Sequence, residues 1–332
     1  MGRYKTIWEN FEKVNKSGQK IETPVLFLLY NRAHLTKKLF NVVGSMCRFK
    51  SVYISIDGPK NNDSDKKKVA DVNDIVKQIT FADEVHYNVN NTNQGCRLAV
   101  ASAIDWFFDN VDEGIILEDD CIPTNEFFTF TSVMLKKFRH DNRIAQICGT
   151  NTLGFYDIES TCLYSNFGSI WGWATWKRSW SLYDYDLIGF DDSKFQNNLI
   201  KKRISNPVDA WFRIRNFRDV KNGKIDTWDY QWMFTRLSHS MLSVIPKVSL
   251  VDNVGVGEDA THTFQSVDSY SINSTQSIRQ NISWSHPSIP KNFLPDYNFE
   301  RLVSEKKRGR WGCGPIVYSL KLFNRIRRYF RS

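Results

Sequence analysis

The sequence predicts an α/β protein built on a mainly parallel sheet with helices on both faces. Through the first half of the chain, apolar runs of strand length alternate with amphipathic stretches of helix length. The first of these runs is continuously hydrophobic, as expected for a strand buried on both faces. Hydrophobic residues make up 41% of the 332 residues, so the chain can form one large domain or two small ones.

The elements follow in order along residues 25–148. Pro24 opens the first strand, Gly44 is expected to end the first helix, and Asp57-Gly58-Pro59 is a turn that closes the second strand. Residues 151–305 are less regular. The predicted strands are 25–29, 52–56, 84–88, 114–117 and 144–148, and the predicted helices are 34–43, 65–79, 95–108 and 126–138.

Polar side chains follow three of these strands, at the point where each strand ends. They are Tyr30-Asn31-Arg32, Asp57 and the acidic triplet Glu118-Asp119-Asp120. Ligands of parallel α/β sheets bind beyond the carboxyl ends of the strands. We therefore expect these residues to share one edge of the sheet and to form a binding site there.

The acidic triplet has two interpretations. Three adjacent carboxylates repel one another unless something compensates their charge, and a divalent cation does so; carboxylate oxygens suit Mg²⁺ or Mn²⁺. Such a cation can bridge the protein to a diphosphate and take up charge on a leaving nucleotide. The alternative is a solvated acidic turn or helix N-terminus that binds nothing.

The stretch from Ile115 to Phe128, IILEDDCIPTNEFF, resembles the acidic motif of the N-acetylglucosaminyltransferase I family. That motif has an apolar strand, an acidic triplet, a short apolar link and a Phe-Phe helix. The resemblance covers roughly residues 23–262, and bacterial sugar transferases of surface-polysaccharide assembly also share the Gly-Glu-Asp-Ala-Thr-His segment at 257–262. The other matching segments, in order, are 23–32, 55–58, 168–176 and 228–232.

The resemblance implies a GT-A fold and an inverting, metal-dependent transfer from a UDP-sugar, with an N-acetylhexosamine as one candidate sugar. It implies a catalytic domain over residues 1–305, with a nucleotide-binding half at about 23–150 and an acceptor-binding half at about 151–305. Within the acidic triplet, it implies that Asp120 binds the metal, Glu118 contacts the ribose and Asp119 contacts the diphosphate or sugar. It also implies that the loop Tyr30-Asn31-Arg32 binds the nucleotide and that Asp57 forms a hydrogen bond to the pyrimidine.

Asp229, in Trp-Asp-Tyr-Gln-Trp, would be the general base that takes the proton of the acceptor hydroxyl. This segment is one residue longer than the family's Trp-Asp-Asp-Trp, so Asp226 and Glu258 are alternatives, and a plain acid at a helix N-terminus is another. Glu258 and its neighbour Asp259 are also candidates for sugar or acceptor binding.

Three further candidates each have a structural alternative. His262 would complete the metal sphere or touch the diphosphate, or be a structural histidine. Arg97 would reach a phosphate or form a surface ion pair. The segment Trp171-Gly172-Trp173 would form the floor of the sugar pocket or belong to the core.

The net charge of +9 lies in a C-terminal tail, residues 306–332. Of 45 basic residues nine lie in this tail, which has no acid, and the other 36 balance the 36 acidic residues. A helix over 316–331 would be amphipathic, so we expect the tail to lie on an anionic membrane surface, near a lipid-linked glycan acceptor. The alternative is a helix that packs on the catalytic body or on another subunit.

The same sequence bounds location and rival functions. No apolar run reaches the roughly 18 residues that span a bilayer, and residues 1–20 are polar, so we expect a cytoplasmic protein at the inner face of the membrane. Six scattered cysteines without a CxxC pair predict reduced thiols. A metal-dependent phosphohydrolase of nucleotide sugars and a nucleic-acid-binding protein are the alternatives, although the neutral body predicts no nucleic-acid partner.

Overall fold

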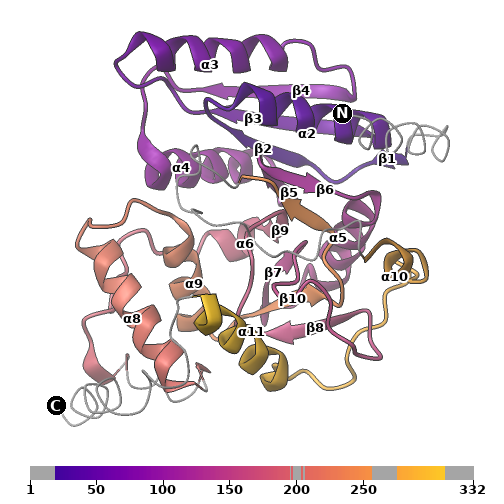
Figure 1. Cartoon of the computed structure of the whole chain (residues 1–332), viewed down its shortest axis with the longest axis vertical. Helices are drawn as coiled ribbons and strands as arrows, with labels where there is room; N and C mark the ends of the chain where they lie inside the picture. Colours follow the sequence, from indigo (N-terminus) through magenta and orange to yellow (C-terminus); the bar gives the residue numbers. More distant parts are fainter. Residues whose placement is uncertain (1–18, 195, 197–202, 205, 256–274, 311–332) are drawn as a thin grey trace.

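The computed structural model describes residues 19–194, 196, 203–204, 206–255 and 275–310 (Figure 1). Within them, nine strands form one sheet in the order β1-β3-β2-β5-β9-β7-β10-β8, and β4 also pairs with β3. The strands are β1 (Gln19–Ile21), β2 (Val25–Leu29), β3 (Cys47–Ile56), β4 (Ala82–Val89), β5 (Glu113–Glu118), β7 (Ile144–Cys148), β8 (Cys162–Ser165), β9 (Trp173–Trp176) and β10 (Leu242–Pro246).

The remaining elements surround this sheet. A separate two-stranded sheet joins β6 (Cys121–Pro123) to β11 (Val251–Asn253). The helices are α2 (Ala33–Met46), α3 (Asp63–Val76), α4 (Gly95–Asn110), α5 (Asn125–Phe138), α6 (Lys177–Trp180), α8 (Pro207–Lys221), α9 (Asp229–Ser238), α10 (Gln276–Gln280) and α11 (Tyr297–Arg310).

The sheet is mainly parallel. Strand β2 pairs in parallel with β3 on one side and with β5 on the other, and β10 pairs in parallel with β7. Two strands run against the rest: β9 is antiparallel to both β5 and β7, and β8 is antiparallel to β10. From β2 the chain passes to β3 and β4 on one side and then to β5 on the other, so the strand order reverses at β2.

Helices cover both faces of the sheet, as alternate residues of β2 show. Phe27 points into a core with α2, α3 and α5, and its ring lies 5.2 Å from that of Phe40. Leu26 and Leu28 point to the other face, into a core with α4, α6 and a tryptophan cluster that includes Trp173. The α/β class, with a mainly parallel mixed sheet flanked by helices, is thereby confirmed.

The five predicted strands and four predicted helices all occur, with boundaries that differ by a few residues. One prediction about them is wrong: Gly44 does not end the first helix, because α2 continues to Met46. A Cβ at Gly44 would lie 3.0 Å from the ring of Phe81, so this glycine allows close packing. The helix ends where Cys47 adopts an extended backbone and begins β3.

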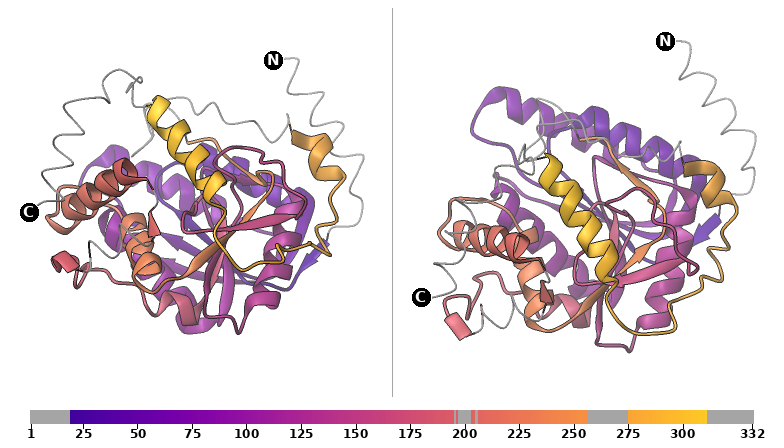
Figure 2. Two further views of the ribbon diagram at one scale, coloured as in Figure 1. Left: turned by 90° about the horizontal axis from the view of Figure 1, so that it is seen from below. Right: turned by 60° about the horizontal axis from the view of Figure 1, so that its bottom comes forward.

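The second half of the chain adds β8, β9 and β10 to the same sheet and forms the helical layer beside it. Helices α8 and α9 pack through Phe217 and Phe234, whose rings lie 5.6 Å apart. Helix α11 packs against β8 through Phe299 and Val303 (Figure 2). None of the helices within the described ranges has both the length and the apolar character needed to cross a membrane.

Candidate active site

A cleft of about 690 Å³ opens at the carboxyl ends of β2, β3 and β5, where the strand order reverses. Such a reversal is the usual ligand site of an open α/β sheet. The prediction that the three strand ends meet at one edge is confirmed. The predicted residues that line this cleft are Tyr30, Asn31, Arg32, Asp57, Glu118 and Asp119.

Arg32 is the charge partner of the acidic triplet. Its Nε donates to Oδ2 of Asp119 at 3.1 Å, its Nη1 donates to Oδ2 of Asp120 at 3.0 Å, and its Nη2 also contacts Asp119. The side chains of these aspartates are 2% and 11% exposed. Burial lowers the pKa of Arg32, but the charges of Asp119 and Asp120 outweigh burial and raise it.

Arg32 does not compensate all of the charge of the acidic triplet. Glu118 is the last residue of β5, and its buried Oε1 has no hydrogen-bond partner in the part of the chain that the structure describes. Burial, followed by repulsion from Asp120 and Asp119, raises the pKa of Glu118 to about 8. Burial also raises the pKa of Asp119 to about 6, although Arg32 opposes this. One guanidinium therefore faces three crowded carboxyl groups.

Both carboxylate oxygens of Asp120, the predicted ligand of Mn²⁺ or Mg²⁺, already have hydrogen-bond partners. Arg32 occupies Oδ2 of Asp120, and Asn253 donates to Oδ1 from Nδ2 at 3.2 Å. Across residues 19–194, 196, 203–204, 206–255 and 275–310, no three His, Cys, Asp or Glu side chains are grouped to hold a metal. Charge compensation that we expected from a cation thus comes from Arg32. The described residues alone do not form a metal site, His262 lies outside them, and metal dependence stays a prediction.

Asp65, which is not among the predicted site residues, holds the loop after β2. Tyr30 Oη donates to Asp65 at 2.7 Å, and Asn31 Nδ2 donates at 2.6 Å. Burial pushes the pKa of Asp65 up, but the hydrogen bonds from Tyr30 and Asn31 outweigh it and leave that pKa below its usual value. The available signal was Asn62, which caps α3 and places Asp65 in the first turn of the helix.

Asp57 lines the cleft and orders the loop before α4. Its carboxylate accepts hydrogen bonds from the backbone N–H of Gly58 at 2.8 Å, from Asn93 Nδ2 at 2.8 Å and from the backbone N–H of Gln94 at 3.0 Å; Asn90 adds a fourth at 3.2 Å. A carboxylate has about four acceptor positions. The predicted hydrogen bond to a pyrimidine stays a prediction, and it would have to replace one of these bonds.

Asp226 and Arg97 are both engaged at the start of α4. The carboxylate of Asp226 accepts the backbone N–H groups of Cys96 at 3.1 Å and Arg97 at 3.2 Å, which caps the helix. The guanidinium of Arg97 stacks on the ring of Tyr185 at 4.0 Å and donates to the carbonyl of Tyr185 at 2.6 Å. The structural alternative for Arg97 is the one observed, because this side chain reaches Tyr185 and Asp186 rather than the cleft.

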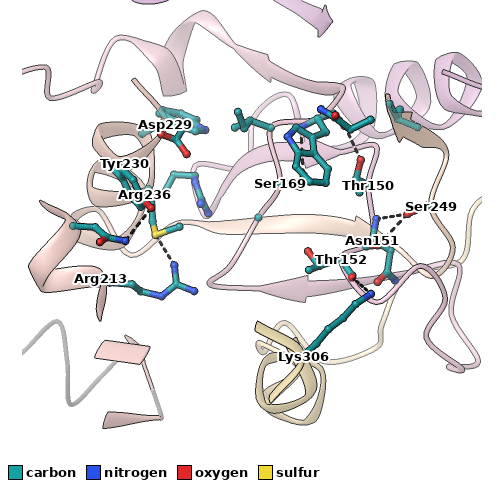
Figure 3. Close-up of a pocket in the computed structure, with 18 of the residues that line it drawn as sticks. Thr150, Asn151, Thr152, Ser169, Arg213, Asp229, Tyr230, Arg236, Ser249 and Lys306 are labelled. Carbon is teal, nitrogen blue, oxygen red and sulfur yellow. Dashed lines mark hydrogen bonds between the residues drawn. The ribbon is translucent and has the colours of Figure 1, made fainter. Parts of the chain in front are cut away.

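A second cavity, of about 310 Å³, is lined by Asp229 (Figure 3). Asp229 begins α9, and Thr227 Oγ1 donates to its Oδ1. Within the described ranges, Oδ2 of Asp229 accepts no hydrogen bond. Asn253 connects this cavity to the acidic triplet, since it lines the cavity and donates to Asp120.

The segment Trp171-Gly172-Trp173 divides between the cavity and the core. Trp171 is half-buried and lines the second cavity. Gly172 has φ +62°, and a Cβ there would meet Val251 at 2.7 Å, so glycine is needed for the turn and the close approach. Trp173 is 1% exposed and packs against Trp228 with ring centroids 5.7 Å apart. The prediction that Trp173 forms a sugar floor is therefore wrong, because its side chain belongs to the core.

Some predicted residues lie outside the described residues. These are Glu258, Asp259 and His262, together with 311–332 of the basic tail. The five cysteines within the described part, Cys47, Cys96, Cys121, Cys148 and Cys162, are free thiols, as predicted.

Comparisons with known proteins give a distant structural likeness and no family match. No protein-family model matches the chain, and no curated protein matches it. A search of solved structures finds the galactosyltransferase LgtC in complex with donor and acceptor sugar analogues, with a TM-score of 0.32 and 7% sequence identity over 66% of this chain and 72% of that chain. A likeness of this degree assigns no activity, so the function is inferred from the residues themselves.

Proposed function

We propose that the chain is a glycosyltransferase that binds a nucleotide-diphosphate sugar in the cleft at β2, β3 and β5 and an acceptor in the second cavity. One observation carries the proposal: Glu118 and Asp119 of the acidic triplet line the cleft, and Asn253, which donates to Asp120 of the same triplet, lines the second cavity together with the half-buried Asp229. A transferase needs such a pair, because donor and acceptor must be held side by side.

The cleft has the groups that a nucleoside diphosphate requires. Lys60, Lys68 and Arg32 line it and offer cationic groups to phosphate oxygens. Carboxylates also line it, namely Asp57, Asp71, Glu118, Asp119 and Asp226. Tyr30 and Asn31 also line the cleft, and both donate hydrogen bonds to Asp65. Its volume of about 690 Å³ lies within the range of roughly 300–1,000 Å³ that is typical of small-molecule sites. The resemblance of the 115–128 segment favours a UDP-sugar and a GT-A type of fold.

Asp229 is the base that the geometry supports over Asp226. An inverting transfer needs one carboxylate oxygen that can take the proton of the acceptor hydroxyl. Thr227 holds Oδ1 of Asp229 at the cavity wall, which leaves Oδ2 for the acceptor. Both carboxylate oxygens of Asp226 instead accept backbone N–H groups of α4, so proton uptake there would weaken the helix cap.

The finer predictions belong to this proposal. A need for Mn²⁺ or Mg²⁺, transfer to a lipid-linked glycan in surface-polysaccharide assembly, and association of the basic tail with the inner face of the membrane are all expectations from the sequence. A chelator in the transfer assay tests the need for a metal, and sedimentation with anionic vesicles tests the membrane association of the tail. A nucleotide-sugar phosphohydrolase is an outcome of the same assay.

The experiment is a screen of nucleotide sugars for thermal stabilisation, followed by a transfer assay with each ligand that stabilises the fold. A ligand at about 100 times its Kd stabilises by roughly 2.7 kcal/mol, which a melting curve resolves. Each assay is run with and without acceptor glycans and with and without chelator. Acceptor-dependent transfer supports the proposal, whereas equal release of nucleotide without acceptor shows a hydrolase. Stabilisation by no nucleotide or nucleotide sugar contradicts the proposal.

A further inference from the structure

The second cavity contains two buried arginines whose hydrogen-bond partners are neutral. Arg213, from α8, is 8% exposed, and Arg236, from α9, is 2% exposed. Both line the cavity together with Lys306 of α11 (Figure 3). Because a buried cation without a counter-ion costs free energy, such a pair needs an explanation.

Arg213 lies in weakly interacting surroundings. Its Nη1 donates to the thioether of Met233 at 2.7 Å, its Cζ lies 4.2 Å from the ring centroid of Phe167, and its buried Nε has no partner among the described residues. Burial lowers the pKa of Arg213, and the charges of Asp209 and Glu300 only partly oppose this. The side chain therefore carries hydrogen-bonding capacity that the described residues leave unused.

Arg236 is bound only to neutral oxygens. Its Nη1 donates to Ser243 Oγ at 2.8 Å and to the carbonyl of Asn166 at 3.2 Å, while its buried Nε has no partner in the described part of the chain. Burial lowers the pKa of Arg236 to about 10, and Arg213 adds repulsion. The two guanidinium groups thus raise the positive potential of one small cavity.

The acids near this cavity do not pair with the two arginines. Asp209 accepts the hydroxyl of Ser304, and Glu300 accepts the hydroxyl of Ser165 at 2.8 Å and the backbone N–H of Asn166 at 2.7 Å. The carboxylate of Asp252 acts on Arg279, and that of Asp229 is held by Thr227. None of these acids forms an ion pair with Arg213 or Arg236 in the described structure, so the two arginines lack a counter-ion of their own.

We propose that the second cavity binds a sugar that carries a carboxylate or a phosphate, and that Arg213 pairs with this anionic group while Arg236 adds positive potential behind it. A guanidinium pairs with either group through two parallel hydrogen bonds. Trp171 and Tyr230 also line the cavity and offer flat apolar faces for the ring. A volume of about 310 Å³ is at the lower end for small-molecule sites, which fits one monosaccharide unit. That this sugar is the acceptor rests on the proposed function.

The test compares three probes: methyl glucuronide, glucose 6-phosphate and neutral methyl glucoside. Their affinities are measured by calorimetry for the wild type, Arg213→Met, Arg213→Lys and the control Arg215→Met. Arg215 lies two residues along α8 on its exposed side, with a side chain that is 59% exposed. We expect an anionic probe to bind the wild type and Arg215→Met about tenfold to a hundredfold more tightly than methyl glucoside.

In Arg213→Met this preference should disappear, and in Arg213→Lys it should be partly kept, because lysine retains the charge but not the two parallel donors. Preference for the glucuronide alone assigns a carboxylate, and preference for the 6-phosphate alone assigns a phosphate. Equal affinity of the wild type for charged and neutral probes, or no binding of any probe, overturns the proposal. An unchanged preference in Arg213→Met also overturns it.

Melting curves separate ligand binding from a packing role. Without ligand, Arg213→Met should melt at or above the wild-type temperature, because methionine fills similar space and removes an unpaired buried charge. A marked drop would show that Arg213 serves the fold and would count against the proposal. If Arg213→Met does not fold, the wild-type probe series and Arg213→Lys still decide. A UDP titration of the same samples reports on the other cleft, so loss of the nucleotide function and loss of the anion site are distinguishable.

Discussion

Removal of Arg32 is the perturbation that most directly tests the structure of the cleft. The guanidinium lies between Asp119 and Asp120, and its side chain is only 19% exposed. Arg32→Gln keeps a polar side chain but removes the charge, which leaves three adjacent carboxyl groups without a cation. Breaking a buried ion pair from one side typically costs about 3–5 kcal/mol. At roughly 2–4 °C per kcal/mol, the melting temperature should fall by about 6–20 °C.

Arg139→Gln is the matched control. Arg139 also forms a two-bond pair with a glutamate, Glu113, at 2.9 and 2.6 Å, but its side chain is 49% exposed. A surface pair of this kind contributes about 0–1 kcal/mol, so its loss should barely change the melting temperature. Equal shifts for Arg32→Gln and Arg139→Gln would refute the conclusion that Arg32 compensates the buried triplet.

A second substitution tests the cause of the loss. If repulsion within the triplet destabilises Arg32→Gln, then adding Asp119→Asn should recover part of the stability, with a coupling of about 0.5–3 kcal/mol in a double-mutant cycle. Strictly additive losses would argue against charge repulsion. Melting with Mn²⁺ adds the metal test, because a cation that binds these carboxylates should stabilise Arg32→Gln more than the wild type.

Three further predictions concern the base, the cleft and the tail. In kinetic assays, Asp229→Asn should lower kcat by about 10²–10⁴ with little change in donor affinity. In melting curves, Asp226→Asn should mainly cost about 1 kcal/mol of stability. A product that keeps the donor's anomeric configuration would exclude the single-base mechanism. Asp65→Asn should lower the free energy of unfolding in urea by about 1–3 kcal/mol at pH 7. Because folding lowers the pKa of Asp65, the difference between wild type and variant should shrink as the pH falls below about 4. A difference that stays constant with pH would contradict this prediction. The full chain should sediment with anionic vesicles at low salt, and a chain that ends at Arg310 should remain in the supernatant. Equal recovery of both would leave residues 311–332 of the tail without a membrane role.

The first half of the fold was predictable because its signals are local. The apolar run Val25–Leu29 has strand length and is bounded by Pro24, and its alternate residues do fill cores on both faces of the sheet. Strands such as β9 were not predicted, because Trp173 to Trp176 form a strand only by pairing with β5 and β7, far away in sequence. Gly44 was misread for a similar reason: its role is to admit the ring of Phe81, which a sequence window does not show.

The candidate site shows the same limit at the level of charge. The sequence places the acidic triplet at a strand end, but it does not show which positive group lies opposite, because Arg32 and Asp119 are 87 positions apart. An arginine and a divalent cation compensate the same carboxylates and so give the same sequence pattern. Asp226 and Asp229 differ in the same way: they are separated by three positions, yet one caps α4 and the other lines the second cavity. Only the tertiary contacts distinguish a carboxylate that caps a helix from one that lines a cavity.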